Sequence, residues 1–108
     1  MVWKIEYHDQ KVQREITELP AGLLARYIHL TDRMITFGPN LGMPHTRSMD
    51  EGLFELRIKA VEGIARVFFF ARTGQRIAML HQFVKKSRKT PSKEIKIARR
   101  RLKEMKNA

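Results

Sequence analysis

The sequence predicts an α+β fold in which a helical hairpin packs on one face of an antiparallel sheet and a further helix ends the chain. Apolar residues alternate in a short N-terminal segment and again between residues 53 and 84, as in strands. They recur at helical spacing between these regions and at the C-terminal end. With 108 residues and 43% hydrophobic content, the chain suits one compact domain, expected to span residues 1–108.

The N-terminal part is expected to be a strand followed by two helices. Residues 2–7 alternate between two faces, which predicts a half-buried strand. Asp9 is expected to cap a short helix, and after the turn at Pro20 a longer helix is expected to run to about Phe37, where Gly38-Pro39-Asn40 ends it. The apolar stripe of this longer helix is predicted to consist of Leu24, Tyr27, Ile28, Thr31, Met34 and Ile35.

A loop, three strands and a helix are expected in the rest of the chain. Residues 41–52 are rich in Gly, Pro and polar residues, which indicates a loop. Strands are predicted at 53–60, 64–72 and 75–84, joined by tight turns. The middle strand is apolar on both faces except for Arg66, as expected at the centre of a sheet covered on both sides. Thr90 is expected to be the N-cap of the final helix.

The net positive charge is confined to the second half of the chain. The formal charge is +11, yet the first 50 residues hold as many anions as cations. A one-sided basic distribution is typical of proteins that bind nucleic acid or the ribosome. A surface charged for solubility alone normally mixes both signs.

Several classes of protein are excluded or disfavoured by what the chain lacks. It has no cysteine, which excludes disulfides and thiolate catalysis and fits a reducing compartment. Early charges such as Lys4 and Glu6 leave no room for a signal peptide, and no apolar run approaches a membrane span. We therefore expect a cytoplasmic protein without membrane contact. The histidines show no metal-ligand spacing, so no metal or other cofactor is expected.

The most informative stretch runs from His81 to Pro91, where an apolar strand ends in a cluster of cations. These are Lys85, Lys86, Arg88 and Lys89. Cations fixed at the end of a buried strand form a preorganised anion site, whereas cations on a mobile tail do not. His81, just before the cluster, is either a proton carrier or a histidine hydrogen-bonded within the fold.

Arg66 lies in the apolar central strand, where an unpaired cation would be costly. Arg57 lies one strand earlier, and the turn near Gly63 would place the two arginines on neighbouring strands, where the register decides whether they share a face. Such a pair can hold a phosphate in a fork geometry. The structural alternative is a salt bridge from either arginine to Glu55 or Glu62.

No Walker loop, HExxH motif or acidic cluster is present. An enzyme acting on phosphodiesters would then work without a protein-bound metal. RNA permits this, because its 2′-hydroxyl can attack the adjacent phosphate while the protein aligns the chain and stabilises charge. A basic stripe on the final helix, containing Lys93, Lys96 and Arg100, is expected to contact RNA, although a solvated face or an anionic membrane would also suit it.

Three blocks of the sequence resemble the phage-derived HigB-like branch of the RelE/ParE toxin superfamily. They are LGMPHTRSMDEGLFELR, GIARVFFF and the segment from Gly74 to Met105. The resemblance implies a RelE-like twisted antiparallel sheet with the helical hairpin on one side. It also implies a type II toxin that cleaves messenger RNA on the ribosome and leaves a cyclic phosphate. Its partner would be a helix-turn-helix antitoxin of the HigA/Xre type, which binds operator DNA as the toxin–antitoxin complex.

Carried onto this chain, the resemblance points to Glu55, Arg57, Arg66, His81, Lys85 and Lys86. RelE has a catalytic tyrosine near its C-terminus, whereas the tyrosines here are Tyr7 and Tyr27 only. His81 or Glu55 must therefore replace it, or the reaction must depend chiefly on cations and alignment.

The sequence thus predicts an endoribonuclease in which Arg57, Arg66 and Lys85 stabilise the scissile phosphate and His81 or Glu55 moves protons. The residues predicted to dock RNA are Lys86, Arg88, Lys89, Lys93, Lys96 and Arg100. The alternative is a non-catalytic, ParE-like inhibitor of DNA gyrase, which the fold alone cannot distinguish. A plain nucleic-acid-binding module is a weaker reading, because Phe68-Phe69-Phe70 is expected in the core and offers no stacking platform.

Overall fold

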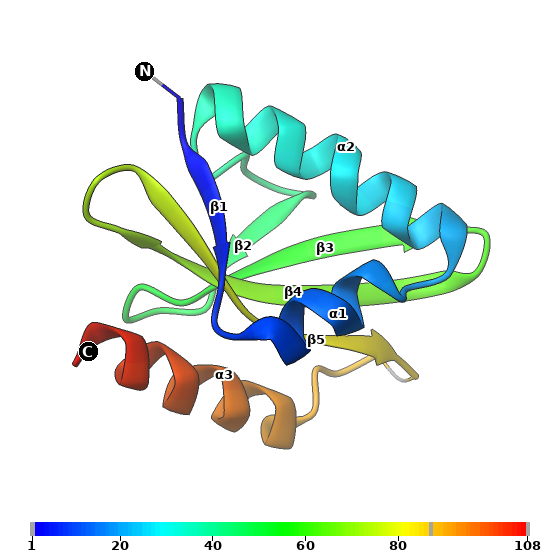
Figure 1. Ribbon diagram of the computed structural model, residues 1–108. Helices are drawn as coiled ribbons and strands as arrows, with labels where there is room; N and C mark the ends of the chain where they lie inside the picture. The colour runs from blue at the N-terminus through cyan, green and yellow to red at the C-terminus, as the bar shows by residue number, and fades with distance from the viewer. Residues whose placement is uncertain (1, 87, 108) are drawn as a thin grey trace.

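The computed structural model describes residues 2–86 and 88–107, which form one five-stranded sheet with helices on both faces (Figure 1). In chain order the elements are β1 (Lys4–Tyr7), α1 (Gln10–Thr17), α2 (Ala21–Phe37), β2 (Thr46–Ser48), β3 (Phe54–Ala60), β4 (Gly63–Arg72), β5 (Arg76–Lys85) and α3 (Ser92–Lys106). The strand order in the sheet is β1-β5-β4-β3-β2. The predicted α+β class, with a helical hairpin on one face and a terminal helix, is confirmed.

The sheet is mixed rather than wholly antiparallel as predicted. Strands β2 to β5 pair antiparallel, but β1 runs parallel to β5, with Ile5 opposite Ile77. Parallel neighbours need a long crossover between them. Here the whole chain between β1 and β5, including the α1–α2 hairpin, provides it.

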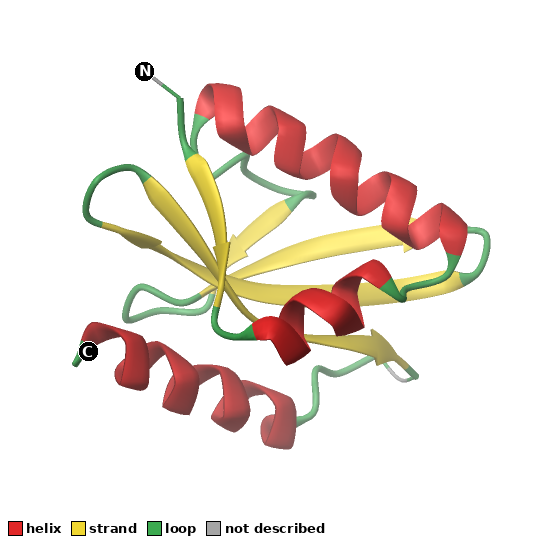
Figure 2. Cartoon of the chain, viewed as in Figure 1, coloured by secondary structure: helices red, strands yellow, loops and turns green. Residues whose placement is uncertain are grey.

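The helices lie on both faces of the sheet (Figure 2). Two apolar clusters hold them there. On one face α1 and α2 pack on residues such as Val67 and Phe69. On the other face α3 packs through Ala98 and Leu102 on residues that include Phe68. Because β4 contributes to both clusters, it is buried on both faces, as predicted for the central strand.

The predicted stripe of α2 is wrong at Ile28, which is half exposed, and it missed Leu23 and Leu30, which are fully buried. The helix is therefore rotated slightly relative to the predicted face. Thr31 belongs to the buried stripe because its hydroxyl donates to the Tyr27 carbonyl at 2.9 Å, which satisfies its polar atom.

The predicted loop at residues 41–52 contains the short strand β2. The hydroxyl of Thr46 donates to Asn40 Oδ1 at 2.9 Å and accepts from the Gly42 amide at 2.8 Å. These bonds fold the segment back on itself. A strand of three residues is too short to show a periodic pattern, so the sequence did not reveal it.

The caps of the helices follow prediction at α1 but not at α3. Asp9 is the N-cap of α1 and accepts from the Val12 amide at 2.9 Å. Pro91 occupies the N-cap of α3, so the prediction for Thr90 is wrong. The Thr90 hydroxyl instead donates to Glu55 Oε2 at 3.1 Å, which is a charge-assisted hydrogen bond to a buried carboxylate.

Candidate functional site

Arg57 on β3 and Arg66 on β4 are directly opposite each other in the sheet. Residues paired in this way project from the same face, which here is the face that α3 covers in part. Strand alternation places Glu55, two residues before Arg57, on this face as well. Lys85 joins them because it lies opposite Ile64, two residues before Arg66. The short strand β2 adds Arg47, opposite Glu55.

These side chains line a cavity of about 370 Å³, which we call the cationic cavity. Its cations are Arg47, Arg57, Arg66, Lys85, Arg88 and Lys89, and Glu55 is the one carboxylate in its wall. An adjoining hollow shares most of these cations and adds Lys86. The structure therefore brings together four strands and the segment before α3 around an excess of positive charge.

Arg66 is the innermost of these cations, with 5% of its surface exposed. Its Nε lies 3.6 Å from Glu55 Oε1, and its Nη1 donates to the Ala65 carbonyl at 3.2 Å. Burial lowers the pKa of Arg66, Glu55 opposes the shift, and Arg57 and Arg47 add to it. A guanidinium nevertheless stays charged. Its Nε has no hydrogen-bond partner among the described residues.

Glu55 is the counterion of Arg66 and is 2% exposed. One of its oxygens faces Arg66 and the other accepts from Thr90. The salt-bridge alternative for Arg66 is therefore present at Glu55. It is absent at Glu62, whose carboxylate accepts from the Gly22 amide at 2.7 Å and so caps α2, which Pro20 leaves without a side-chain cap.

Arg57 and Lys85 have no carboxylate partner in the described part of the chain. Arg57 makes a 3.9 Å contact with Met43 Sδ, and Lys85 makes neither a hydrogen bond nor an ion pair there. Burial and then Arg66 lower the pKa of Lys85, and Glu55 only partly offsets them. Six cations beside one carboxylate give the cavity an excess of positive charge, which suits an anion.

The structure does not bring His81 to the cationic cavity. Its Nε2 lies 2.8 Å from Glu94 Oε1 and its Nδ1 lies 3.2 Å from Arg101 Nη1, both on α3. Arginine only donates, so Nδ1 accepts and Nε2 carries the proton given to Glu94. Both ring nitrogens thus serve to hold α3 against the sheet.

The residues predicted to dock RNA fall into two groups. Lys86, Arg88 and Lys89 lie at or beside the cationic cavity. Lys93, Lys96 and Arg100 line a separate, shallow hollow on the exposed side of α3. The second group therefore does not converge on the same anion as Arg57 and Arg66.

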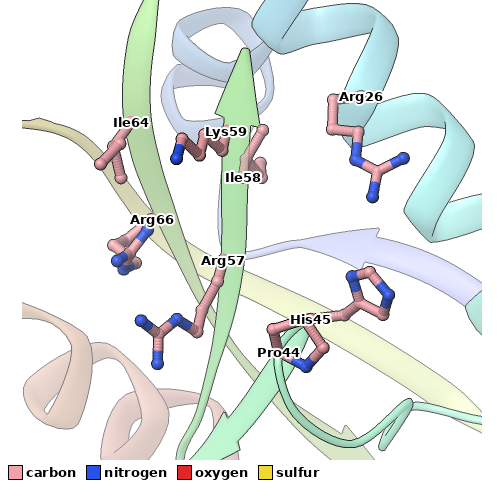
Figure 3. A pocket seen from close by; sticks show the side chains of 8 residues that line it. All are labelled: Arg26, Pro44, His45, Arg57, Ile58, Lys59, Ile64 and Arg66. Atoms are coloured by element: carbon pink, nitrogen blue, oxygen red, sulfur yellow. The ribbon is translucent and has the colours of Figure 1, made fainter.

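A larger cavity, of about 630 Å³, straddles β3 and shares Arg57 and Arg66 with the cationic cavity (Figure 3). Arg26 from α2 and His45 from the segment before β2 lie on the far side of β3 from Arg66. Burial and then the nearby Arg33 and Arg26 lower the pKa of His45. We call this space the second cavity.

Sequence reasoning missed Arg47, Arg26, His45 and Thr90 as parts of these cavities. Arg47 lies on the strand that was too short to predict, and Arg26 lies on α2, far from β3 in the sequence. Only the register and the packing of α2 bring them near Arg57, and no local pattern encodes either.

The described residues hold neither a metal-ion cluster nor a membrane-spanning helix. Across 2–86 and 88–107, no three His, Asp or Glu side chains are grouped as a metal ion would require. Within the same ranges, no helix has the length and apolar character needed to cross a membrane.

The mixed sheet, the helices on its two faces and the cationic cavity define a small basic α+β protein with a cavity lined mainly by cations. The model of the phage-derived Gp49-like proteins (DUF891) matches residues 14–103, so the chain belongs to this family. It is a family of RelE/HigB-type toxin-like proteins, and membership implies an antitoxin as partner. The match includes every residue that lines the cationic cavity. No curated protein matches the chain.

Proposed function

We propose that this protein is the toxin of a type II toxin–antitoxin pair and a HigB-like endoribonuclease that cleaves messenger RNA on the ribosome without a protein-bound metal. The observation that carries the proposal is the convergence of Arg57, Arg66 and Lys85 on one cavity with little countercharge. Its natural ligand is a phosphate whose negative charge grows during reaction.

In the proposed reaction the 2′-oxygen of a ribose attacks the adjacent phosphorus. A P–O2′ bond forms and the P–O5′ bond breaks, which leaves a 2′,3′-cyclic phosphate and a 5′-hydroxyl end. Arg57 and Arg66 stabilise the charge on the non-bridging oxygens. Lys85, whose pKa is lowered by burial, gives its proton to the departing 5′-oxygen. The 2′-hydroxyl proton passes to solvent water.

Glu55 and His81 act in this scheme as positioning residues. Glu55 orients Arg66 and holds Thr90, while His81 anchors α3 through Glu94 and Arg101. The reaction then depends chiefly on substrate alignment and electrostatic stabilisation, which together account for large rate accelerations.

The remaining cations would bind the rest of the RNA. Lys86, Arg88 and Lys89 would contact phosphates next to the cleavage site, and Lys93, Lys96 and Arg100 would contact ribosomal RNA from the exposed side of α3. A helix-turn-helix antitoxin would neutralise the toxin, and operator DNA would be bound only through that complex.

Mapping transcript ends by primer extension after induction tests the proposal, in cells and with purified protein with and without ribosomes. We expect new ends inside coding sequences for the unchanged protein and for Arg14→Ala, an exposed cation on α1. Arg57→Ala should remove them. Growth arrest with DNA breaks and an SOS response, but without new RNA ends, would instead establish gyrase as the target.

A further inference from the structure

The second cavity has the features of a binding site next to the cationic cavity. It takes Arg26 from α2, His45 from the segment before β2, and Lys59 from β3. Arg57 and Arg66 belong to both cavities. A single ligand can therefore occupy both cavities while it contacts the guanidinium groups of Arg57 and Arg66.

The edge of β3 is open where the second cavity crosses it. Strand β2 pairs only with residues 54–56 of β3, and the His45 carbonyl accepts from the Arg57 amide at 2.8 Å. Beyond this bond β3 continues to Ala60, with β4 as its one neighbouring strand in the described chain. A chain bound at Arg57 can thus pass over this edge toward α2 (Figure 3).

The charges that line the second cavity are all positive. No carboxylate is among its lining residues, and neither Arg26 nor Lys59 makes a hydrogen bond or ion pair within the described ranges. The positive charge of Arg26 and Arg33 helps to lower the pKa of His45, which is a separate sign of excess positive potential. A neutral imidazole adds hydrogen-bonding capacity without adding further charge.

The lining also offers apolar surface, from Pro44 and Ile64. Anion-binding groups beside apolar surface and an imidazole ring suit a nucleotide, which has a phosphate and a flat base. A ligand that fills both adjoining cavities must present an anion in each of them. RNA fits this requirement better than a peptide does, because RNA has a phosphate at every residue.

We propose that the second cavity binds the nucleotide adjoining the cleavage site, with Arg26 on its phosphate and His45 and Pro44 against its base. The RNA strand would then cross the open edge of β3 between the two cavities. This inference rests on the proposed function, since it takes the scissile phosphate to lie at Arg57 and Arg66.

Short oligoribonucleotides that carry a 2′-deoxy group at the attacking ribose test the inference by calorimetry. A dinucleotide has only the scissile phosphate, and two trinucleotides extend it by one nucleotide on the 5′ or the 3′ side. We expect Arg26→Ala to weaken one trinucleotide roughly tenfold, the loss expected for one charge-assisted hydrogen bond, and to leave the dinucleotide unchanged. The slope of log K against log salt should become shallower by about 0.7, the value for one neutralised phosphate on a single strand.

The matched control is Arg14→Ala, which removes an exposed arginine of α1 that lines neither cavity. The ring protons of His45, assigned with His45→Gln, should shift in NMR spectra with that trinucleotide and not with the dinucleotide. Equal affinities for Arg26→Ala and Arg14→Ala would overturn the second cavity as a nucleotide site and leave the cleavage proposal intact.

Two other outcomes also contradict the inference. If an acidic peptide such as tetraglutamate depends on Arg26 and the trinucleotides do not, the second cavity is a protein-docking site. If the unchanged protein binds none of the probes, the inference fails, and the transcript ends then decide separately whether the proposed function fails with it.

Discussion

The hydroxyl of Thr90 donates a 3.1 Å hydrogen bond to Oε2 of Glu55, 35 residues earlier in the chain. Glu55 is also the counterion of Arg66, so one buried carboxylate links β3, β4 and the segment before α3. This segment contributes Arg88 and Lys89 to the wall of the cationic cavity. The cavity is therefore closed by a polar contact between distant parts of the chain.

Thr90→Val should destabilise the protein by about 1–3 kcal/mol, because the change keeps the shape of the side chain but leaves a buried carboxylate oxygen without its donor. The free energy of unfolding is measured in urea. Thr36→Val is the control, since the Thr36 hydroxyl is exposed and its bond to the Asp32 carbonyl is long, at 3.5 Å. Equal stability of the two variants would show that the Thr90–Glu55 bond contributes nothing.

Arg57→Ala should leave thermal stability nearly unchanged and reduce RNA cleavage by on the order of 10²–10³-fold, the usual cost of losing a donor to transition-state charge. The stability prediction follows because Arg57 has no carboxylate partner among the described residues. Cleavage is measured by single-turnover kinetics on messenger RNA. A large fall in melting temperature, or cleavage at the normal rate, contradicts the assigned role.

Arg66→Ala should behave differently and cost about 3–5 kcal/mol of stability, because it leaves Glu55 as a buried carboxylate without its counterion. The double variant Glu55→Gln/Arg66→Met should recover most of this stability without recovering cleavage. Chemical denaturation of both variants checks the comparison. Failure of the double variant to recover would mean that the Glu55–Arg66 pair is not the source of the loss.

The affinity of the cationic cavity for an anion should fall as the pH rises. The fall should begin at a lower pH than it would for a lysine with an ordinary pKa. Lysine binds anions only in its protonated form, and burial together with Arg66 lowers the pKa of Lys85 below the usual 10.5. Affinity for pyrophosphate, measured by calorimetry, should therefore fall as the pH rises through the alkaline range below 10.5. Lys85→Arg should remove this fall, because arginine stays charged. The exposed Lys4→Arg is the control.

Phosphate should raise the melting temperature of the unchanged protein more than chloride does at equal ionic strength. An anion that binds only the folded state stabilises it, by about 2.7 kcal/mol at a hundredfold excess over its dissociation constant. The double variant Arg57→Ala/Lys85→Ala is the control for general effects of phosphate on protein stability. It should lose most of the difference in melting temperature between phosphate and chloride. An undiminished shift in the double variant argues against a built anion site.

Local patterns in the sequence were enough to predict most of the fold and part of the site. Alternation gave the three long strands, and the turn before β4 brought Arg57 and Arg66 onto adjacent strands, as the register confirms. The parallel pairing of β1 was not predictable, since a strand's neighbour depends on the packing of the whole chain. The same holds for Thr90, whose capping preference is local but whose acceptor, Glu55, is distant in sequence.

His81 shows why position along a strand is not enough to place a side chain at a site. It lies on the face of β5 that carries Lys85, but α3 covers the sheet at that point and supplies Glu94 and Arg101 as partners. A bulge between Phe68 and Phe69 further shifts the register beside it. On this face of β5, α3 covers His81 but leaves Lys85 open to a ligand. The position of the helix over the sheet therefore decides which of these two residues can bind one.

Strand β4 is paired on both sides and covered on both faces. Amides in such a strand exchange their hydrogens through global opening of the molecule, whereas loops and free edges exchange through small fluctuations. Arg66 thus lies on a strand whose amides we expect to exchange slowly. Arg47 lies on a short edge strand, and Arg88 and Lys89 lie in a connecting segment. Substitutions at Arg47, Arg88 and Lys89 can therefore change which ligand is bound without unfolding the protein. Substitutions at Arg66 are limited because they also affect the stability of the fold.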